Sequence, residues 1–385
     1  MIRRFLHYAG LLAALAGLAG CGGGALIQAD EAPAVSVSDQ GPVIDRVWQA
    51  KVGSASAPAH RLGPAVLDER VFVAAGDGEV QALDADTGER LWRVEREAPL
   101  ASGPAVAAGR VVLGTADGRV LALSAADGAL RWEAEVSSEV LAPPAIGQGV
   151  VVARTADGRV FALDADTGAQ QWLYSRSLPA LSLRGHSAPV LVRNGVVAGF
   201  DNGRLSALDL ADGNPVWEAT VAIPRGRTDL ERMVDIDADP LISRGDLFAG
   251  AYQGRVVGMT LANGEIGWGR DISVLGGLAA DTTNLYVTDA QGRIWALDRA
   301  NGASVWRADA LEGTRLSAPV FHGGRLAVAG SDGFVTWLDT DDGRVLARYR
   351  VGDAQIVSQP VVRDGLLYVL DLAGRLQALG INQKR

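Results

Sequence analysis

Residues 82–92 read ALDADTGERLW, and residues 162–172 repeat the pattern as ALDADTGAQQW. In both stretches an Asp-x-x-Thr-Gly segment follows apolar residues, and a Trp stands four residues after the Gly. Asp favours turns and Gly tolerates positive φ, so the pattern predicts a tight turn between two strands. Self-similarity at this level is the sequence signature of a repeat architecture.

The same unit recurs eight times along the chain. The starts equivalent to Pro64 are Pro104, Pro144, Pro189, Pro240, Leu278, Pro319 and Pro360. A Gly stands 14 residues after all eight starts, and a Trp stands 28 residues after six of them. Each unit reads as four short strands separated by Gly turns, without helical periodicity. The sequence therefore predicts an all-β fold, an eight-bladed β-propeller of four-stranded antiparallel blades.

A propeller ring has to be closed, and the eighth unit ends before its last strand. Residues 45–49 carry a Trp, Trp48, in the matching local context. We expect this N-terminal strand to complete the last blade, so that residues 43–385 form one domain. We also expect the repeated Trp residues to be structural, because a large aromatic side chain buries much apolar area. Unit seven differs, with Ala347 at the Trp position.

The N-terminus has the features of a secretory signal. Two Arg residues precede an apolar run over about residues 5–18, which is too short to span a bilayer. The next residues, Leu-Ala-Gly-Cys ending at Cys21, resemble the lipobox of bacterial lipoproteins, which implies cleavage and lipid attachment at Cys21. Gly22 in place of Asp implies the outer membrane. Residues 1–20 are thus expected to be a lipoprotein signal peptide, and residues 21–42 the lipidated Cys and a flexible tether. The alternative is an ordinary secreted protein with one stray Cys.

Composition argues against several classes of function. The 385 residues are 48% apolar and 21% charged, as in globular proteins. The net charge is −9 and the Arg residues are scattered, so a nucleic-acid partner is not expected. Cys21 is the only Cys, which excludes an intrachain disulfide framework and a Cys-rich metal site. The chain has no GxSxG elbow, no HExxH and no phosphate-binding loop, so we expect no catalytic residues and no cofactor.

One acidic segment could bind a metal ion. Asp235, Asp237 and Asp239 alternate like the start of a calcium loop. The sixth position is Pro instead of Gly, however, and the twelfth is Asp instead of Glu. The three His residues outside the signal segment fall in different repeat units. We therefore expect no metal site.

Two connections between units are unusually long. They run from Trp172 to Pro189 and from Trp217 to Pro240, on either side of unit four, so they are neighbours on one face of the ring. Both contain apolar residues beside Arg and Asp, a mixture that suits a binding site on a rigid scaffold. The alternative is that the apolar residues cover the rim and the charges solvate the loops.

The repeat motif is similar to the tryptophan-docking repeat of quinoprotein propellers, A-x-D-x-x-T-G-x-x-x-W. Dehydrogenases of that class use pyrroloquinoline quinone, are much longer, and generally carry a vicinal Cys pair and calcium-binding residues. The motif is a folding signature and does not itself imply a cofactor. We expect no enzyme activity, and a quinoprotein-like dehydrogenase is the alternative from another functional class.

The lipobox, the repeats and the segments LSLRG (residues 181–185) and DID (residues 235–237) together resemble the BamB family. This family is a lipoprotein component of the outer-membrane β-barrel assembly machinery, the BAM complex. The resemblance implies a non-catalytic scaffold that binds the periplasmic domains of BamA, the central barrel subunit, and assists insertion of outer-membrane proteins. By position, the implied contacts are Leu181, Leu183, Arg184, Asp235 and Asp237.

The resemblance also implies a location and a second role. The chain would be anchored by its lipid to the outer membrane, face the periplasm, and act as a monomer within a hetero-complex. It would help to deliver unfolded outer-membrane proteins, whose strands could pair with blade edges. Arg184 is expected to pair with Asp235 or Asp237 across the neighbouring loops. The rival within binding proteins is a propeller for another envelope partner or for peptidoglycan.

Overall fold

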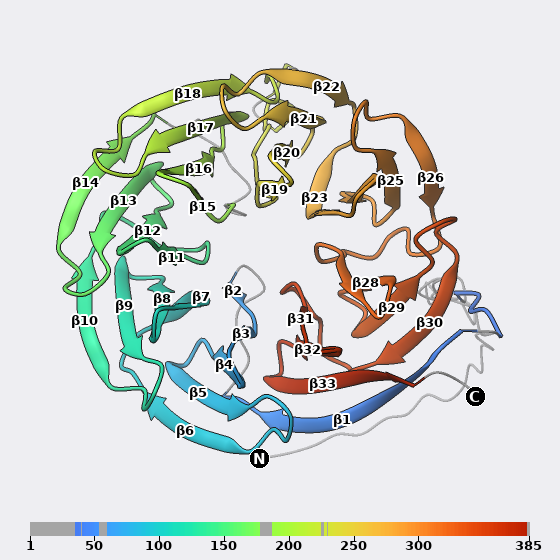
Figure 1. The fold of residues 1–385 in the computed structure, drawn as a ribbon, viewed down its shortest axis with the longest axis horizontal. Coiled ribbons are helices and arrows are strands. Elements are labelled where there is room, and N and C mark those ends of the chain that lie inside the picture. The colour runs from blue at the N-terminus through green and yellow to red at the C-terminus, as the bar shows by residue number, and fades with distance from the viewer. Residues whose placement is uncertain are drawn as a thin grey trace, which may run out of the picture. The chain divides into compact units, whose positions relative to one another are not determined.

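The computed structural model describes residues 35–39, 41–53, 60–177, 187–224, 227–228 and 230–382. In these residues 33 strands are present and no helix. Accordingly, this part of the chain contains no helix long and apolar enough to cross a membrane. The strands form eight sheets arranged around a ring (Figure 1). The prediction of an all-β, eight-bladed propeller is confirmed.

The first four blades follow the chain in order (Figure 1). Blade 1 contains β3 (Ala65–Leu67), β4 (Arg70–Ala74), β5 (Glu79–Asp84) and β6 (Arg90–Glu95). Blade 2 contains β7 (Leu100–Ala107), β8 (Arg110–Thr115), β9 (Arg119–Ser124) and β10 (Leu130–Glu135). Blade 3 contains β11 (Ala145–Gly147), β12 (Val150–Arg154), β13 (Arg159–Asp164) and β14 (Gln170–Ser175). Blade 4 contains β15 (Val190–Val192), β16 (Gly195–Gly199), β17 (Arg204–Asp209) and β18 (Pro215–Thr220).

The remaining blades continue the same order. Blade 5 contains β19 (Leu241–Ser243), β20 (Asp246–Gly250), β21 (Val256–Thr260) and β22 (Ile266–Arg270). Blade 6 contains β23 (Val274–Ala280), β24 (Asn284–Asp289), β25 (Ile294–Asp298) and β26 (Ser304–Ala308). Blade 7 contains β27 (Val320–His322), β28 (Arg325–Ala329), β29 (Phe334–Leu338) and β30 (Val345–Arg350). Blade 8 contains β31 (Val361–Arg363), β32 (Leu366–Leu370), β33 (Arg375–Asn382) and β1 (Val43–Lys51).

Closure of the ring joins the two ends of the described chain. β1 pairs antiparallel with β33, from Val43 opposite Asn382 to Lys51 opposite Arg375. The N-terminal strand therefore completes the last blade, as the repeat count predicts. An additional short strand, β2 (Arg61–Leu62), pairs in parallel with β7 of blade 2 near the centre of the ring (Figure 1). The sequence pattern did not predict β2, because two residues are too few to show a period.

The outer strand of every blade except blade 7 carries a Trp that joins it to the next blade. In blade 2, Trp132 Nε1 donates a hydrogen bond to the carbonyl of Ala165 in blade 3, at 2.9 Å. The equivalent bonds run from Trp48 to Ala85, Trp92 to Ala125, Trp172 to Leu210, Trp217 to Leu261, Trp268 to Arg299 and Trp306 to Thr340. A Trp N–H can only donate, and a buried one needs such an acceptor. The repeated Trp residues are therefore structural.

The Asp-x-x-Thr-Gly segment builds the turn on which the Trp of the preceding blade rests. Asp84 Oδ1 accepts hydrogen bonds from the N–H and the hydroxyl of Thr87, both at 2.9 Å. These bonds hold the pKa of Asp84 below its usual value. Gly88 then has a φ of +72°, and a Cβ there would lie 2.6 Å from the ring of Trp48. The Gly is needed both for the turn and for the close approach of the indole.

The seam between blades 7 and 8 is built differently. In blade 7 the Trp and the small residue opposite it have changed places. Trp337 lies on the third strand and pairs with Ala347 on the fourth. Trp337 Nε1 donates to His322 Nδ1 at 3.1 Å. His322 Nε2 must then carry the proton, and it donates to the carbonyl of Gly365 in blade 8 at 2.8 Å. A buried His thus links blade 7 to blade 8.

Substitution of Gly168 tests the Trp seat, with Gly149 as a matched control. The φ angles are +74° and +79°, so Ala causes the same backbone strain at both positions. A Cβ at Gly149 meets nothing within 4 Å, but at Gly168 it lies 2.6 Å from Trp132. We expect Gly149→Ala to cost about 1 kcal/mol and Gly168→Ala about 1–3 kcal/mol more, from overpacking. The melting temperatures of the two variants are measured by circular dichroism. Equal melting temperatures would contradict close packing of Trp132 on Gly168.

The link through His322 predicts a pH-dependent stability. Burial lowers the pKa of His322, and its bond to Gly365 only partly opposes this effect. The unfolded chain, with a His pKa of about 6.5, then binds the proton more readily than the folded chain. This stabilising contribution is complete above about pH 6.5 and is lost as the pH falls below that value. We expect the melting temperature to fall more between pH 7.5 and 5.5 for the wild type than for His322→Gln. Parallel pH curves would refute the role of His322.

Candidate functional site

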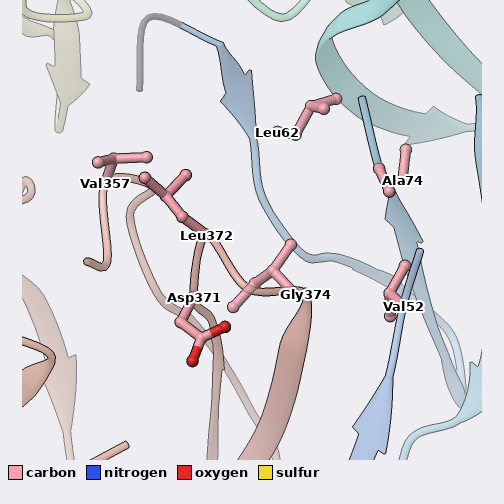
Figure 2. Close-up of a pocket in the computed structure, with 9 residues that line it drawn as sticks. Val52, Leu62, Ala74, Val357, Asp371, Leu372 and Gly374 are labelled. Carbon is pink, nitrogen blue, oxygen red and sulfur yellow. The ribbon is translucent and has the colours of Figure 1, made fainter. Parts of the chain in front are cut away.

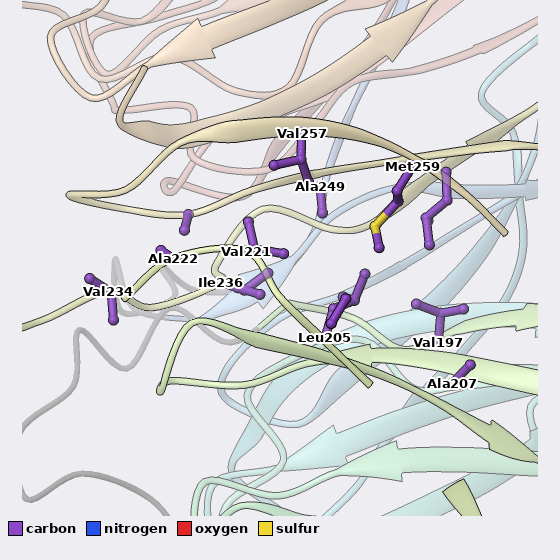
Figure 3. Close-up of a cluster of buried hydrophobic side chains, with 13 residues drawn as sticks. Val197, Leu205, Ala207, Val221, Ala222, Val234, Ile236, Ala249, Val257 and Met259 are labelled. Atoms are coloured by element: carbon purple, nitrogen blue, oxygen red, sulfur yellow. The ribbon is translucent and has the colours of Figure 1, made fainter. Parts of the chain in front are cut away.

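The long connection between β18 and β19 is bonded to both neighbouring blades. Its buried side chains in the cluster between blades 4 and 5 include Val221, Ala222, Val234 and Ile236 (Figure 3). The N–H of Ile236 donates to the carbonyl of Phe200 in blade 4 at 3.3 Å. The carbonyl of Asp235 accepts a hydrogen bond from the N–H of Tyr252 in blade 5 at 2.8 Å. The described part of this connection is therefore a fixed feature of the surface.

A hydrogen-bonded turn lies in the middle of this connection, where the N–H of Arg232 donates to the carbonyl of Thr228 at 3.2 Å. The hydroxyl of Thr228 accepts from the N–H of Glu231 at 3.2 Å, and Glu231 Oε2 accepts from the N–H of Thr228 at 3.3 Å. This reciprocal arrangement is a capping box. Glu231 Oε2 also accepts from the N–H of Arg227 at 2.7 Å, and these backbone bonds lower the pKa of Glu231. The capping box fixes the direction in which the turn presents its side chains.

Two apolar side chains of the same connection point to solvent. Ile223 is 63% exposed and Leu230 is 61% exposed, among the highest values for large apolar residues in the described chain. Large aliphatic side chains held in solvent on a rigid support are suited to contact another protein. Sequence reasoning did not select them, although an apolar residue inside a polar connection was the available signal.

The acidic residues selected from the sequence are inside the protein and not on its surface. Asp235 is 0% exposed and Asp237 is 8% exposed. The next carboxylate, Asp239, accepts both terminal nitrogens of Arg61 from β2, at 2.8 and 2.7 Å. It also accepts the N–H of Ala188 at 2.7 Å. Burial lowers the pKa of Arg61, but Asp239 and Asp237 outweigh burial and hold it above its usual value. The acidic segment is thus part of an internal network.

The first long connection is described only at its two ends, Ser177 and Ser187. Its predicted contact residues, Leu181, Leu183 and Arg184, lie outside the described residues, as does Cys21. Ser187 and Ile236 both lie against Gly199, where an added Cβ would come within 2.7 Å of Ser187 Oγ and 2.6 Å of the Ile236 side chain. The two long connections therefore meet at blade 4.

An open hollow of about 490 Å³ lies at the start of the first connection. Its lining includes Tyr174, Arg176, Ser177, Asn202, Arg204 and Glu218. Glu218 accepts hydrogen bonds from Arg176 and from the Tyr174 hydroxyl. Its Oε2 lies 3.5 Å from Nη1 of Arg204. These contacts, with the Arg176 bond first, lower the pKa of Glu218. The hollow is polar, and its charges already pair within the protein.

A second cavity lies between blade 8 and β2, near the ring centre (Figure 2). Its volume is about 10 Å³, and its lining includes Val52, Leu62, Asp371 and Leu372. This volume is enough for about one water molecule, so the cavity does not accommodate an organic cofactor. Among the described residues, no three His, Cys, Asp or Glu side chains are placed to hold a metal ion.

Comparison with known proteins gives a consistent result. The sequence matches the family described as "Outer membrane protein assembly factor BamB" over residues 12–102, 76–308 and 302–384. A protein of that name from Alkalilimnicola ehrlichii is 57% identical over 369 residues, which cover 96% of this chain and 95% of the relative. The corresponding protein of Pseudomonas aeruginosa is 42% identical over 377 residues, covering 97% and 98%. The crystal structure of BamB from Moraxella catarrhalis matches with a TM-score of 0.81 at 26% identity, covering 88% of this chain and 100% of that one.

The different environments of Ile236 and Leu230 predict that truncation to Ala lowers the stability strongly at Ile236 and very little at Leu230. Ile236→Ala removes a fully buried side chain between two blades, and we expect a loss of about 2–5 kcal/mol. Leu230→Ala changes a side chain that is 61% exposed, and we expect a change below about 0.5 kcal/mol. Thermal unfolding of the two variants measures the difference. A large loss for Leu230→Ala would show that this side chain serves the fold instead of a surface.

Proposed function

This chain belongs to the BamB family of outer membrane protein assembly factors, and we propose that it is a scaffold that binds the periplasmic domains of a BamA-like barrel subunit. The relatives are named assembly factors and not enzymes. The observation that carries the proposal is the connection between β18 and β19. It is bonded to two blades through Ile236 and Asp235, and it exposes Ile223 and Leu230 to solvent.

The proposed binding surface consists of both long connections. Arg184 belongs by sequence to the connection that ends at Ser187. Ser187 and Ile236 both lie against Gly199. Exposed aliphatic side chains on a rigid support suit contact with another protein, and Arg is enriched among the residues that dominate binding energy. Asp235 and Asp237 are buried, so they act by holding the connections in position. The direct contacts would then come from Leu181, Leu183 and Arg184 together with Ile223 and Leu230.

The proposed location is the periplasmic side of the outer membrane. The sequence around Cys21 resembles a lipobox, and lipidation there would tether the propeller to the membrane through residues 21–42. The described residues before β1 run along blade 7, where the N–H of Ser38 donates to the carbonyl of Val345 at 3.1 Å.

A second role would use the outer blade edges. Each outer strand is the last strand of its sheet, as β18 is in blade 4, so one side of its backbone has no neighbouring strand among the described residues. An extended segment of an unfolded outer-membrane protein could add to such an edge by backbone hydrogen bonds. The edge of β30 is partly occupied by the bond from Ser38. The proposal therefore favours the other outer strands.

Reversal of charge at Arg184 tests the partner. Binding of lipid-free residues 22–385 to the periplasmic domains of the same organism's BamA-like protein is measured by calorimetry. We expect Arg184→Glu to weaken binding at least tenfold, since an interface cation becomes an anion. Arg193→Glu is the control, because Arg193 is exposed on the β15–β16 turn and its charge change is identical. Circular dichroism confirms that all three proteins are folded.

The other outcomes distinguish the remaining possibilities. Binding that survives Arg184→Glu would keep the partner but place the site elsewhere on the ring. No binding by the wild type at tens of micromolar would overturn the proposed partner and indicate a different component of the envelope.

A further inference from the structure

The junction of blades 3 and 4 departs from the repeat at two positions. The residue ten positions after each unit start is Ala, Gly, Thr or Leu in seven units, but it is Arg154 in unit three. The residue twelve positions after the start is Gly, Ala, Ser, Tyr or Leu in seven units, but it is Asp201 in unit four. Arg154 ends β12, and Asp201 lies in the turn between β16 and β17. A charged pair thus stands where the other blades have uncharged residues.

These two residues form a fully buried ion pair. The side chains of Arg154 and Asp201 are 0% and 1% exposed, and Arg154 donates to Asp201 Oδ1. Arg154 Nε and Nη1 are buried without a hydrogen-bond partner. Removing such groups from water costs more free energy than an incompletely bonded pair returns, so apolar residues would stabilise the ring as well or better. The pair therefore needs an explanation other than stability.

Phe200 connects the ion pair to the second long connection. The guanidinium of Arg154 lies 5.6 Å from the centre of the Phe200 ring, and that of Arg176 lies 5.8 Å from it. The Phe200 carbonyl accepts the N–H of Ile236, which stands between the two buried carboxylates Asp235 and Asp237. The position of Phe200 thus determines where this part of the second connection sits.

Phe200 also lies near the described ends of the first connection. Arg176 contacts the Phe200 ring immediately before Ser177, where that connection begins. Ser187, where the described chain resumes, lies against Gly199, the residue before Phe200. The described ends of the first connection and Ile236 of the second connection therefore lie around Phe200, whose ring centre is 5.6 Å from the Arg154 guanidinium.

We propose that the Arg154–Asp201 ion pair is a positioning element that fixes Phe200 and, through it, Ile236 and the described part of the second partner-binding connection. The inference rests on the proposed function, because it assigns the pair to the same binding surface. The buried charges would specify one arrangement of this connection, and its exposed side chains would make the contacts. A merely structural pair would instead affect the stability of the whole ring.

The test replaces both charges together. Arg154→Met/Asp201→Asn removes both charges of this pair together instead of leaving one of them unpaired, so the ring is expected to fold. The matched control is Arg293→Met/Asp289→Asn in blade 6, where the Asp side chain is 0% exposed and its carboxylate lies 2.7 Å from Arg293 Nε. Both variants and the wild type are studied as full chains in detergent. Binding to the BamA-like periplasmic domains and hydrogen exchange of the Ile236 amide are measured, together with melting temperatures.

We expect the Arg154→Met/Asp201→Asn variant to bind at least tenfold more weakly and the Ile236 amide to exchange at least tenfold faster. The control should stay within twofold of the wild type in both measurements. If the wild type and the Arg154→Met/Asp201→Asn variant bind the BamA-like domains equally well, the positioning role is overturned and the proposed function is left intact. Absence of wild-type binding would overturn the proposed function, and the exchange of Ile236 would still decide the positioning role. Unchanged exchange in that case would refute it.

Discussion

The fold depends on the indole N–H of an outer-strand Trp donating to a carbonyl of the next blade. The hydrogen bond from Trp132 Nε1 to the carbonyl of Ala165 is 2.9 Å long. The indole ring of Trp132 packs against Gly168, whose φ is +74°. A single four-stranded blade cannot bury both of its faces, so each blade is stable only against its neighbours. The Trp sets the spacing and the angle between two blades in one contact, and the Gly makes that contact sterically possible. Repetition of this contact leads the blades back to β1 and β33, whose pairing closes the ring.

The closing region shows what happens where the repeated contact is replaced. The eighth unit takes its last strand from the N-terminus, and Trp48 on that strand restores the ordinary contact with blade 1. Across the other seam, Trp337 lies on the third strand and donates to His322, which in turn bonds to Gly365. Both solutions bury an aromatic side chain and satisfy its N–H, so the same physical requirement is met by two different residue patterns.

The sequence predicts the fold well because the requirements of the repeat are local. A turn with positive φ needs Gly, as at Gly88, and a buried Trp needs a small residue opposite, so both leave a visible period. The exchange of Trp337 and Ala347 was visible as a break in that period, but its bonding partner was not. Burial of Asp235 could not be predicted either, because it depends on contacts with blades 4 and 5 that no local pattern records. The partner contacts of Leu181, Leu183 and Arg184 stay predictions, since these residues lie outside the described residues.

The site separates the residues that shape the surface from those that form it. Asp235 and Asp237 have almost no contact with solvent, and a direct contact of either carboxylate with a partner stays a prediction. The charge of Asp237 acts without direct contact on a neighbouring group, since it contributes, with the directly bonded Asp239, to the raised pKa of Arg61. Ile223 and Leu230 have the reverse property, since they are mostly exposed and would gain free energy by burial against the proposed partner. A resemblance in sequence does not separate these two kinds of residue, whereas burial in the structure distinguishes side chains inside the protein from side chains on its surface.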